Sequence, residues 1–319
     1  MNRLGLIREN HRMPFTCAYC GGNKYKSFLR KDAKDGQPLA VAACLECGLA
    51  QLAEIPSDEA LKEFYGSKYR IEYKGRKWPT KKHAFRAGTR AKERLSKMGP
   101  FIKVGYRHLD VGSGGGEFTY LAKQAGMHAQ GIDLATDYLE FARDTYDLTL
   151  RNIGLLDIPD SETYQVITMF HVLEHLPRPD DAFAKVHDLL VDDGIFVVEV
   201  PNLESKRTSP TNTYFKAHTT YFTQASLEIL ASKYFSIEFF EKSKNLFAVL
   251  RKKPLSNEPD DLRALSVETS LSRLENKNLG EYAANGGLTS MLRKIGPVFR
   301  EKLIIAGKSH KAVLDRFNR

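Results

Sequence analysis

Two hydrophobic periods alternate along residues 106–200. Short apolar runs have the length of buried strands, and the stretches between them place apolar residues at helical spacing. The runs lie at 106–111, 127–132, 164–170 and 194–200. Strands that alternate with amphipathic helices are typical of a parallel sheet with helices on both faces. Residues 233–252 read as two more strands joined by a short turn, a hairpin that would close such a sheet. We therefore predict one α/β domain over residues 101–253.

The first strand runs directly into a glycine-rich turn. The segment reads LDVGSGGGEF, and a helix is expected over residues 117–125. Glycine allows positive φ angles and lets the backbone pass close to a bound cofactor. A dinucleotide site also uses such a loop, so the loop alone does not identify the cofactor. The acidic residues after the next two strands give further information. Asp133 ends the second strand, 23 residues after Asp110, where a carboxylate can accept hydrogen bonds from ribose hydroxyls. Asp157 follows the third strand, where it can meet an adenine amino group.

All four cysteines lie within the first 50 residues. They form two CxxC pairs, Cys17 with Cys20 and Cys44 with Cys47. Four thiolates in two such pairs are typical ligands of one tetrahedral Zn²⁺ in a zinc ribbon. Disulfides are disfavoured in a reducing compartment, and a redox motif would need only one pair. We predict a zinc-ribbon leader over residues 14–55, whose closed site holds the fold together and does no chemistry.

Charge is unevenly distributed. The net charge is +9, and an acidic middle region is flanked by basic ends. Residues 68–97 combine many Lys and Arg residues with aromatic residues that include Tyr69, Tyr73 and Trp78. This mixture suits RNA or a sugar-phosphate substrate, and it also fits a basic helix that packs on the next domain. We assign residues 56–100 to a basic helical linker.

The ends of the chain carry no membrane or secretion signal that we recognise. No run approaches the roughly 18 apolar residues of a membrane-spanning helix, and the first residues lack an apolar signal core. A cytoplasmic protein is the expectation. Residues 254–319 begin with a polar linker and continue as amphipathic segments, so we predict a helical C-terminal extension. It can pack on the domain, form a homodimer contact or lie on an anionic membrane surface.

The glycine loop, Asp133, the acid of LLDIP and the segment FHVLEHLPRP together resemble the successive motifs of S-adenosylmethionine-dependent methyltransferases. The resemblance implies a Rossmann-like sheet of seven strands in the order 3-2-1-4-5-7-6, with the seventh strand antiparallel. It also implies S-adenosylmethionine as cofactor. The cofactor-binding residues implied are Asp110, Gly112, Ser113, Gly114, Gly116, Asp133, Leu134, Asp157, Ile158 and Phe170.

The N-terminal pattern CAYCGG, CLECGLAQL and EALKEFYGSKYR resembles bacterial methyltransferases that carry a zinc-binding leader and are often tied to glycan biosynthesis. This resemblance implies O-methylation of a nucleotide-linked or lipid-linked sugar. One alternative is an RNA base methyltransferase, because a zinc module and a basic helix also suit rRNA. The turn FHVLEH lacks the Asn/Asp-Pro-Pro-aromatic pattern common in amino-directed nucleic-acid enzymes. The other alternative is a non-catalytic scaffold that binds the cofactor.

Two histidines are the predicted catalytic residues. His171 follows the fourth strand, and His218 precedes a helix expected to begin near Thr223. Either can take the proton of an acceptor hydroxyl. His171, Glu174 and His175 also match an inverted zinc-protease pattern, but that pattern needs a helix and here an apolar strand precedes it. A related methyltransferase group is thought to place a divalent ion near an acidic version of this segment, and the histidine at position 171 disfavours one here.

Overall fold

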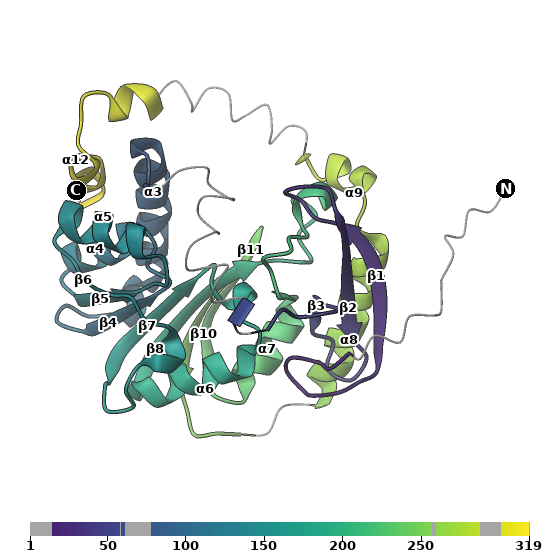
Figure 1. The fold of residues 1–319 in the computed structure, drawn as a ribbon. Coiled ribbons are helices and arrows are strands. Elements are labelled where there is room, and N and C mark those ends of the chain that lie inside the picture. Colours follow the sequence, from purple (N-terminus) through teal and green to yellow (C-terminus); the bar gives the residue numbers. More distant parts are fainter. Residues whose placement is uncertain (1–14, 58, 61–77, 257–259, 288–300, 319) are drawn as a thin grey trace.

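The structure is a computed structural model that describes residues 15–57, 59–60, 78–256, 260–287 and 301–318 (Figure 1). Part of the predicted helical linker lies outside these ranges, including Tyr69 and Tyr73. Two sheets organise the described residues, one of seven strands and one of four. The larger sheet positions the candidate site, and the smaller one joins the N-terminal residues to it.

The larger sheet has the order β10-β11-β8-β7-β4-β5-β6. Its strands are β4 Arg107–Val111, β5 His128–Ile132, β6 Thr149–Arg151, β7 Tyr164–Phe170, β8 Leu190–Pro201, β10 Phe235–Lys242 and β11 Asn245–Lys252. The pairings among β4, β5, β6, β7 and β8 are parallel, whereas β11 runs antiparallel to both β8 and β10. The α/β fold, the predicted strand order and the antiparallel seventh strand are therefore confirmed.

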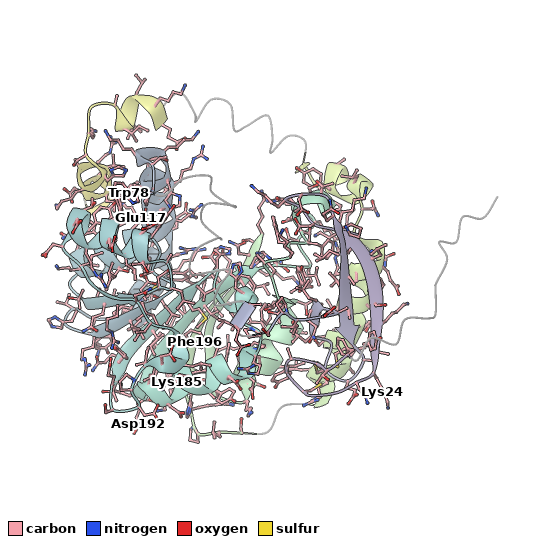
Figure 2. The ribbon with its side chains drawn as sticks, viewed as in Figure 1. Lys24, Trp78, Glu117, Lys185, Asp192 and Phe196 are labelled. Carbon is pink, nitrogen blue, oxygen red and sulfur yellow. The ribbon has the colours of Figure 1, made fainter. Side chains whose placement is uncertain are left out.

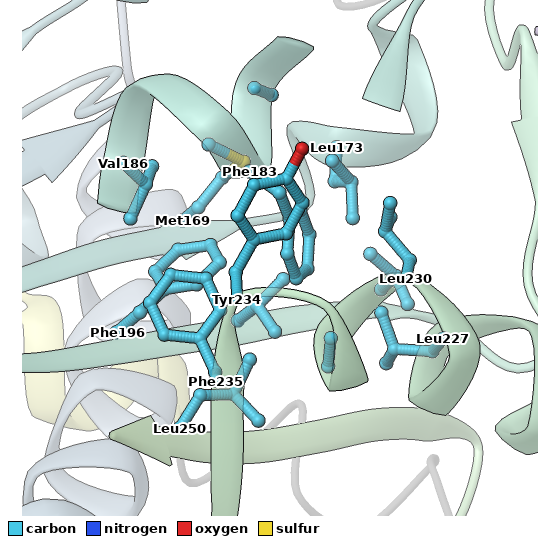
Figure 3. Packing of buried hydrophobic residues seen from close by; sticks show 14 of the residues in the cluster. Met169, Leu173, Phe183, Val186, Phe196, Leu227, Leu230, Tyr234, Phe235 and Leu250 are labelled. Carbon is cyan, nitrogen blue, oxygen red and sulfur yellow. The ribbon is translucent and has the colours of Figure 1, made fainter. Parts of the chain in front are cut away.

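Helices cover both faces of this sheet (Figure 1). The helices of one face are α3 Lys81–Met98, α4 Glu117–Gln124, α5 Thr136–Tyr146 and α12 His310–Leu314; those of the other are α6 Pro179–Leu189 and α7 Gln224–Ser232. Successive strand residues point to opposite faces, so Val197 and Val198 belong to different cores. Figure 3 shows Phe183 of α6 packed between β8 and the start of β10. Burying one such ring contributes roughly 1.5–3 kcal/mol.

The smaller sheet crosses the predicted leader boundary. Its strands, in the order β1-β2-β3-β9, are β1 Tyr25–Lys31, β2 Pro38–Cys44, β3 Ala50–Leu52 and β9 Thr220–Tyr221. The first three belong to the predicted leader, but β9 comes from the segment between β8 and α7. All pairings in this sheet are antiparallel. The leader is therefore completed by a strand that lies about 170 residues further along the chain.

The C-terminal extension packs on both ends of the molecule. Helix α8, Asp260–Asn276, lies against β1, β2 and α7, and α9, Leu279–Ala284, follows it. Gly48 of the leader lies so close to Ser266 of α8 that a side chain would not fit. At the other end, Phe317 contacts Phe85 of α3. In the ranges that the structure describes, no helix is both long and apolar enough to cross a membrane.

Candidate active site

The glycine-rich loop connects β4 to α4. Gly112, Gly114 and Gly116 have φ angles of 72°, 55° and 78°, a region that favours glycine. A Cβ on Gly112 would overlap the side chain of Val172. The Asp133 carboxylate accepts hydrogen bonds from the backbone N–H groups of Gly114 and Ala135, each at 2.8 Å. Asp133 therefore fixes the loop at the carboxyl ends of β4 and β5.

A cavity of about 720 Å³ opens above this loop. Its walls are the glycine loop, the short turn at 154–157, the residues that follow β7, and one side of α3. It lies beyond the carboxyl ends of the parallel strands, where open α/β sheets bind their ligands. Its volume is within the range of about 300–1,000 Å³ that is usual for cofactor and small-molecule sites.

Six of the ten predicted cofactor-binding residues line this cavity. They are Gly112, Ser113, Gly114, Leu134, Asp157 and Phe170. The Ser113 hydroxyl oxygen is buried and has no hydrogen-bond partner within the described part of the chain. A bound ligand that hydrogen-bonds this hydroxyl would remove the cost of leaving a buried polar atom unpaired.

The other four predicted residues are not among those that line the cavity. Asp110 is buried and accepts hydrogen bonds from Thr119 at 2.7 Å and Thr168 at 2.8 Å. Burial raises the pKa of Asp110 to about 6, although these two hydrogen bonds oppose the change. Gly116 precedes α4, Ile158 is in the core and Asp133 braces the loop. These positions support the wall from behind, and direct cofactor contact by these four residues stays a prediction.

Helix α3 supplies cavity residues that were not among those predicted from the sequence. His83, Arg90 and Arg94 line the cavity from one face of this helix, and Glu117 lies opposite at the start of α4. Figure 2 shows Glu117 on this side of the molecule and Lys24 of the leader on the other. Burial lowers the pKa of Arg90. The spacing of seven and four residues between the three basic residues was the available signal, because it places them on one helical face.

His171 lies between two carboxylates. Its φ is 57°, an uncommon conformation for a residue with a side chain. Its Nδ1 atom is 3.3 Å from Glu174 Oε1, and its Nε2 atom is 3.4 Å from Glu199 Oε1. Burial by itself would lower the pKa of His171, but hydrogen bonds to Glu174 and Glu199 outweigh it and raise the pKa to about 9. The imidazole therefore carries a proton at neutral pH.

Glu199 also binds Arg94 across the domain. Arg94 Nε donates to Glu199 Oε2 at 2.6 Å, and the two side chains are only 12% and 11% exposed. The Arg94 guanidinium also stacks 4.1 Å from the ring centre of Phe170. Burial would raise the pKa of Glu199, but His171 and Arg94 outweigh it and lower the pKa. This buried cluster joins α3 to β8 beside the cavity.

A family model matches the region that builds this site. The model is described as a methyltransferase domain, and it matches residues 82–234. The chain carries a methyltransferase domain. The matched segment begins within α3, so this helix, which we had assigned to a linker over residues 56–100, belongs to the segment that matches the domain model.

Several relatives of the methyltransferase domain are named ubiquinone biosynthesis O-methyltransferase. The one from Glaesserella parasuis is 31% identical over 113 residues, which are 32% of this chain and 48% of that relative. The one from Hydrogenovibrio crunogenus is 40% identical over 80 residues, which are 22% of this chain and 32% of that relative. The chain therefore matches about half the length, or less, of these curated relatives.

Solved methyltransferase structures are similar at low identity. A structure described as a SAM-dependent methyltransferase from Archaeoglobus fulgidus has a TM-score of 0.45 and 19% identity, covering 58% of this chain and 98% of that one. Magnesium protoporphyrin IX methyltransferase from Synechocystis, crystallised with bound SAH, has a TM-score of 0.46 and 14% identity, covering 62% and 100%.

The methyltransferase domain brings Glu174, His175 and His218 together. One ring nitrogen from each histidine and one carboxylate oxygen of Glu174 all lie within 4.8 Å of one another. The pKa of Glu174 is lowered to about 2, because the hydrogen bond and charge of His171 outweigh the effect of burial. Burial and the neighbouring His175 lower the pKa of His218 to about 3. At neutral pH Glu174 is therefore ionised and His218 is neutral.

The inverted zinc-protease pattern does not have its required geometry. Glu174 and His175 lie in a single 3-10 turn, Leu173–His175, and not on a longer helix. His175 Nδ1 donates to the backbone carbonyl of Ala217 at 2.8 Å, while His171 faces Glu174. The protease alternative therefore has no structural basis in this segment.

The four cysteines of the leader form a separate cluster. All four Sγ atoms lie within 4.8 Å of one another, and those of Cys17 and Cys47 are 3.5 Å apart. Those of Cys20 and Cys44 are 3.6 Å apart. Sulfur atoms at the corners of a tetrahedral Zn²⁺ site, with Zn–S bonds of about 2.3 Å, would lie about 3.8 Å apart. The donor set and spacing fit the predicted structural zinc.

We predict that the purified protein holds about one Zn²⁺ per chain on these cysteines. Replacing Cys44 with Ser should remove the metal and loosen the leader, because the closed site compensates for its small core. Binding of S-adenosylmethionine should be largely kept, because none of the four cysteines lines the large cavity. Elemental analysis of freshly purified, reduced protein measures the metal. A metal-free wild-type sample would contradict the zinc assignment.

Proposed function

We propose that the chain is an S-adenosylmethionine-dependent methyltransferase that methylates a hydroxyl group of a small molecule. The observation that carries this proposal is the cavity between the glycine loop and the segment containing His171 and Glu174. The match to a methyltransferase-domain model supports the transfer reaction. The names of the relatives, O-methyltransferases, support oxygen as the acceptor atom.

The residues of the cavity fit the cofactor. Gly112 lines the cavity without a side chain, and the buried Ser113 hydroxyl lacks a partner among the residues described. Gly112, Ser113, Leu134 and Asp157 would hold the cofactor from the β4, β5 and β6 side. When bound, S-adenosylmethionine supplies a methyl group attached to a good leaving group. Orientation of the acceptor then accounts for most of the acceleration that the protein must provide.

His218 is the residue that we propose as the general base. It is neutral at neutral pH, and its Nδ1 atom is buried without a partner within the described ranges. The Oε2 atom of the ionised Glu174 is also buried and unpaired there. As His218 takes the hydroxyl proton, the Glu174 carboxylate would stabilise the imidazolium that forms. His171 is already protonated, so its proposed role is to hold Glu174 and Glu199 in place.

The basic residues of α3 support a small-molecule acceptor more than RNA. Arg94 is paired with Glu199, and Lys97 is paired with Glu241 at 2.8 Å. Arg86 is paired with Glu301. Groups that are engaged inside the protein are not available to neutralise phosphates. The sugar acceptor implied by the resemblance offers a hydroxyl group, and the name O-methyltransferase that the relatives carry also indicates an oxygen acceptor.

We expect calorimetry to detect S-adenosylmethionine binding, and Asp133→Ala to weaken it by roughly 1.5–3 kcal/mol, as for a charged hydrogen bond. Asp133 holds the glycine loop through Gly114, so its loss also frees the loop. Asp192→Ala, an exposed aspartate of β8, is the matched control. Unchanged affinity in Asp133→Ala would contradict the site.

Methyl transfer itself is tested with radiolabelled S-adenosylmethionine and three acceptor classes. These are a sugar nucleotide, catechol and total rRNA. Label on either hydroxyl compound supports the proposal. Label on RNA alone, with a steep loss of binding as salt rises, would establish the RNA alternative instead. Cofactor binding without transfer to any of them would favour the non-catalytic scaffold.

A further inference from the structure

A second cavity of about 260 Å³ adjoins the large one. Pro201 and His218 line both cavities. The lining of the second cavity also includes Asn212, Phe215 and Thr220. Because His218 lies at the junction, a molecule in the second cavity can present one group to His218 and to the cofactor side together.

Two polar atoms of this junction lack partners. The Thr220 side chain is fully buried, and its hydroxyl has no hydrogen-bond partner in the described part of the chain. The same holds for His218 Nδ1. Leaving a buried polar group unpaired is unfavourable, and a ligand that hydrogen-bonds to it would remove that cost. Both residues line the second cavity, so the structure leaves hydrogen-bonding capacity there for a ligand.

The chemistry of the walls favours a sugar-like ligand. The lining includes the amide groups of Asn212 and Asn245, the hydroxyl of Thr220 and the rings of Phe215 and Tyr221. A sugar ring has hydroxyl groups around its edge and apolar C–H groups on its faces. Amides and hydroxyls can donate to and accept from such hydroxyls, and an aromatic ring can cover a C–H face.

The leader supports one wall of this cavity from behind. Strand β3 pairs with β9, with Ala50 opposite Tyr221 and Gln51 opposite Thr220. The backbone N–H of Leu52 donates to the carbonyl of Thr219 at 2.9 Å. The two residues of β9 both line the cavity, so the leader sheet sets where they lie.

Asp32 makes the second connection between leader and cavity. Its buried carboxylate accepts from the N–H groups of Lys34 and Asp35 within its own turn, at 2.7 and 3.1 Å. Its other oxygen accepts from the backbone N–H of Lys216 at 2.5 Å. The N–H of Ala33 donates to the carbonyl of Tyr214 at 2.7 Å. The loop that contains Phe215 is thereby tied to the turn between β1 and β2.

We propose that the second cavity is the acceptor site of the methyltransferase, that it takes a sugar-like, hydroxyl-rich acceptor, and that the cysteine leader holds its wall in place. This inference rests on the proposed function. It assigns Thr220 to acceptor binding and makes Asp32 a positioning residue that acts through the loop at 214–219. It also gives the leader a role in acceptor binding that is separate from the cofactor.

The ligand class is tested by saturation-transfer NMR on the full zinc-loaded chain with SAH added. The probes are methyl α-D-glucopyranoside and catechol. We expect signal transfer to the glucoside. In Thr220→Val, which removes the hydroxyl and keeps the side-chain shape, the glucoside signal should fall at least threefold. Thr149→Val, at an exposed position of β6, is the matched control. Transfer to catechol alone, or to neither probe, would overturn the acceptor assignment.

The role of the leader is tested by hydrogen exchange of the amides at 212–221. Asp32→Asn keeps an oxygen for the turn but presents an N–H₂ group to the Lys216 N–H. We expect at least tenfold faster exchange in this segment, a raised KM for the acceptor with kcat kept, and unchanged exchange at 110–134. Asp35→Asn is the control, because its pair with Lys216 Nζ is exposed. Removal of the metal should reproduce the Asp32→Asn pattern.

Two results would overturn the leader's role. One is unchanged exchange at 212–221 in both Asp32→Asn and metal-free protein. The other is an equal change at 110–134, which would indicate general loosening of the domain. Calorimetry with S-adenosylmethionine on the same samples separates the two proposals. If the wild-type protein does not bind the cofactor, the proposed function is refuted. If it binds the cofactor normally but exchange at 212–221 is unchanged in Asp32→Asn and in metal-free protein, only this inference is refuted.

Discussion

His218→Ala should lower kcat by about 10²–10⁴-fold, the usual loss when a general base is removed. His218 is neutral over the whole range from pH 5 to 8, because burial lowers its pKa to about 3. It lines both cavities, and Glu174 lies beside it. Steady-state kinetics on the acceptor found in the transfer assay, with calorimetry on S-adenosylmethionine, measures the effect. Cofactor affinity should stay within about threefold of the wild type, because the acceptor side alone is changed.

His128→Ala is the matched control for that variant, because His128 is exposed at the opposite end of the sheet. It should turn over at the wild-type rate. If His218 only shapes the acceptor loop, its removal will raise KM and leave kcat unchanged. Wild-type kcat in His218→Ala would rule out the proposed base. His171→Ala would then be compared, since His171 was the other histidine predicted from the sequence.

Arg94→Ala should lower the free energy of unfolding by about 3–5 kcal/mol, the typical loss when one partner of a buried ion pair is removed. Arg94 and Glu199 are nearly enclosed, and the guanidinium also covers the Phe170 ring. Urea denaturation measures the change. Lys97→Ala, on the same helix, breaks the ion pair between Lys97 and Glu241. Because these two side chains are 32% and 40% exposed, the free energy of unfolding should fall by only about 0–1 kcal/mol. An equal loss of unfolding free energy in the two variants would contradict the prediction that the buried ion pair stabilises the fold more than the exposed one.

The same cluster sets the pH range of this stabilisation. The pKa of His171 rises from 6.5 to about 9 on folding, so its contribution is complete below pH 6.5 and is lost as pH rises through 9. The pKa of Glu199 is lowered from 4.5, so its contribution is present above pH 4.5 and is lost as pH falls further. Unfolding midpoints measured from pH 4 to 10 test both limits. His171→Asn should remove the loss on the alkaline side.

Local pattern was enough for much of the fold. The alternation of apolar strands and amphipathic helices, together with the resemblance, predicted the seven-stranded order that the structure has. The glycines at 112, 114 and 116 indicated a tight loop, because positive φ is a property of the residue type itself. The two CxxC pairs likewise predicted four thiols in one place. Each of these features depends on neighbours in the sequence or on a short motif.

Contacts between distant segments decided the rest. Asp110 belongs to a recognisable motif, but its side chain faces Thr119 and Thr168 inside the domain, which only the packing of α4 and β7 on β4 determines. Helix α3 was assigned to a basic helical linker that could pack on the domain or bind a ligand, yet Arg94 is buried against a glutamate 105 residues later. A side chain that gains a distant partner leaves no periodic signal, so the sequence alone does not reveal the pairing.

The leader shows the same division most clearly. By itself the sequence determined a compact cysteine-rich unit, because the ligand types and their spacing specify a metal knuckle locally. Only the tertiary structure brought β9 to the edge of that unit and joined Asp32 to the loop at 214–219. A two-residue strand is too short to be read from hydrophobic pattern, and it exists because the partner edge of β3 satisfies its backbone groups.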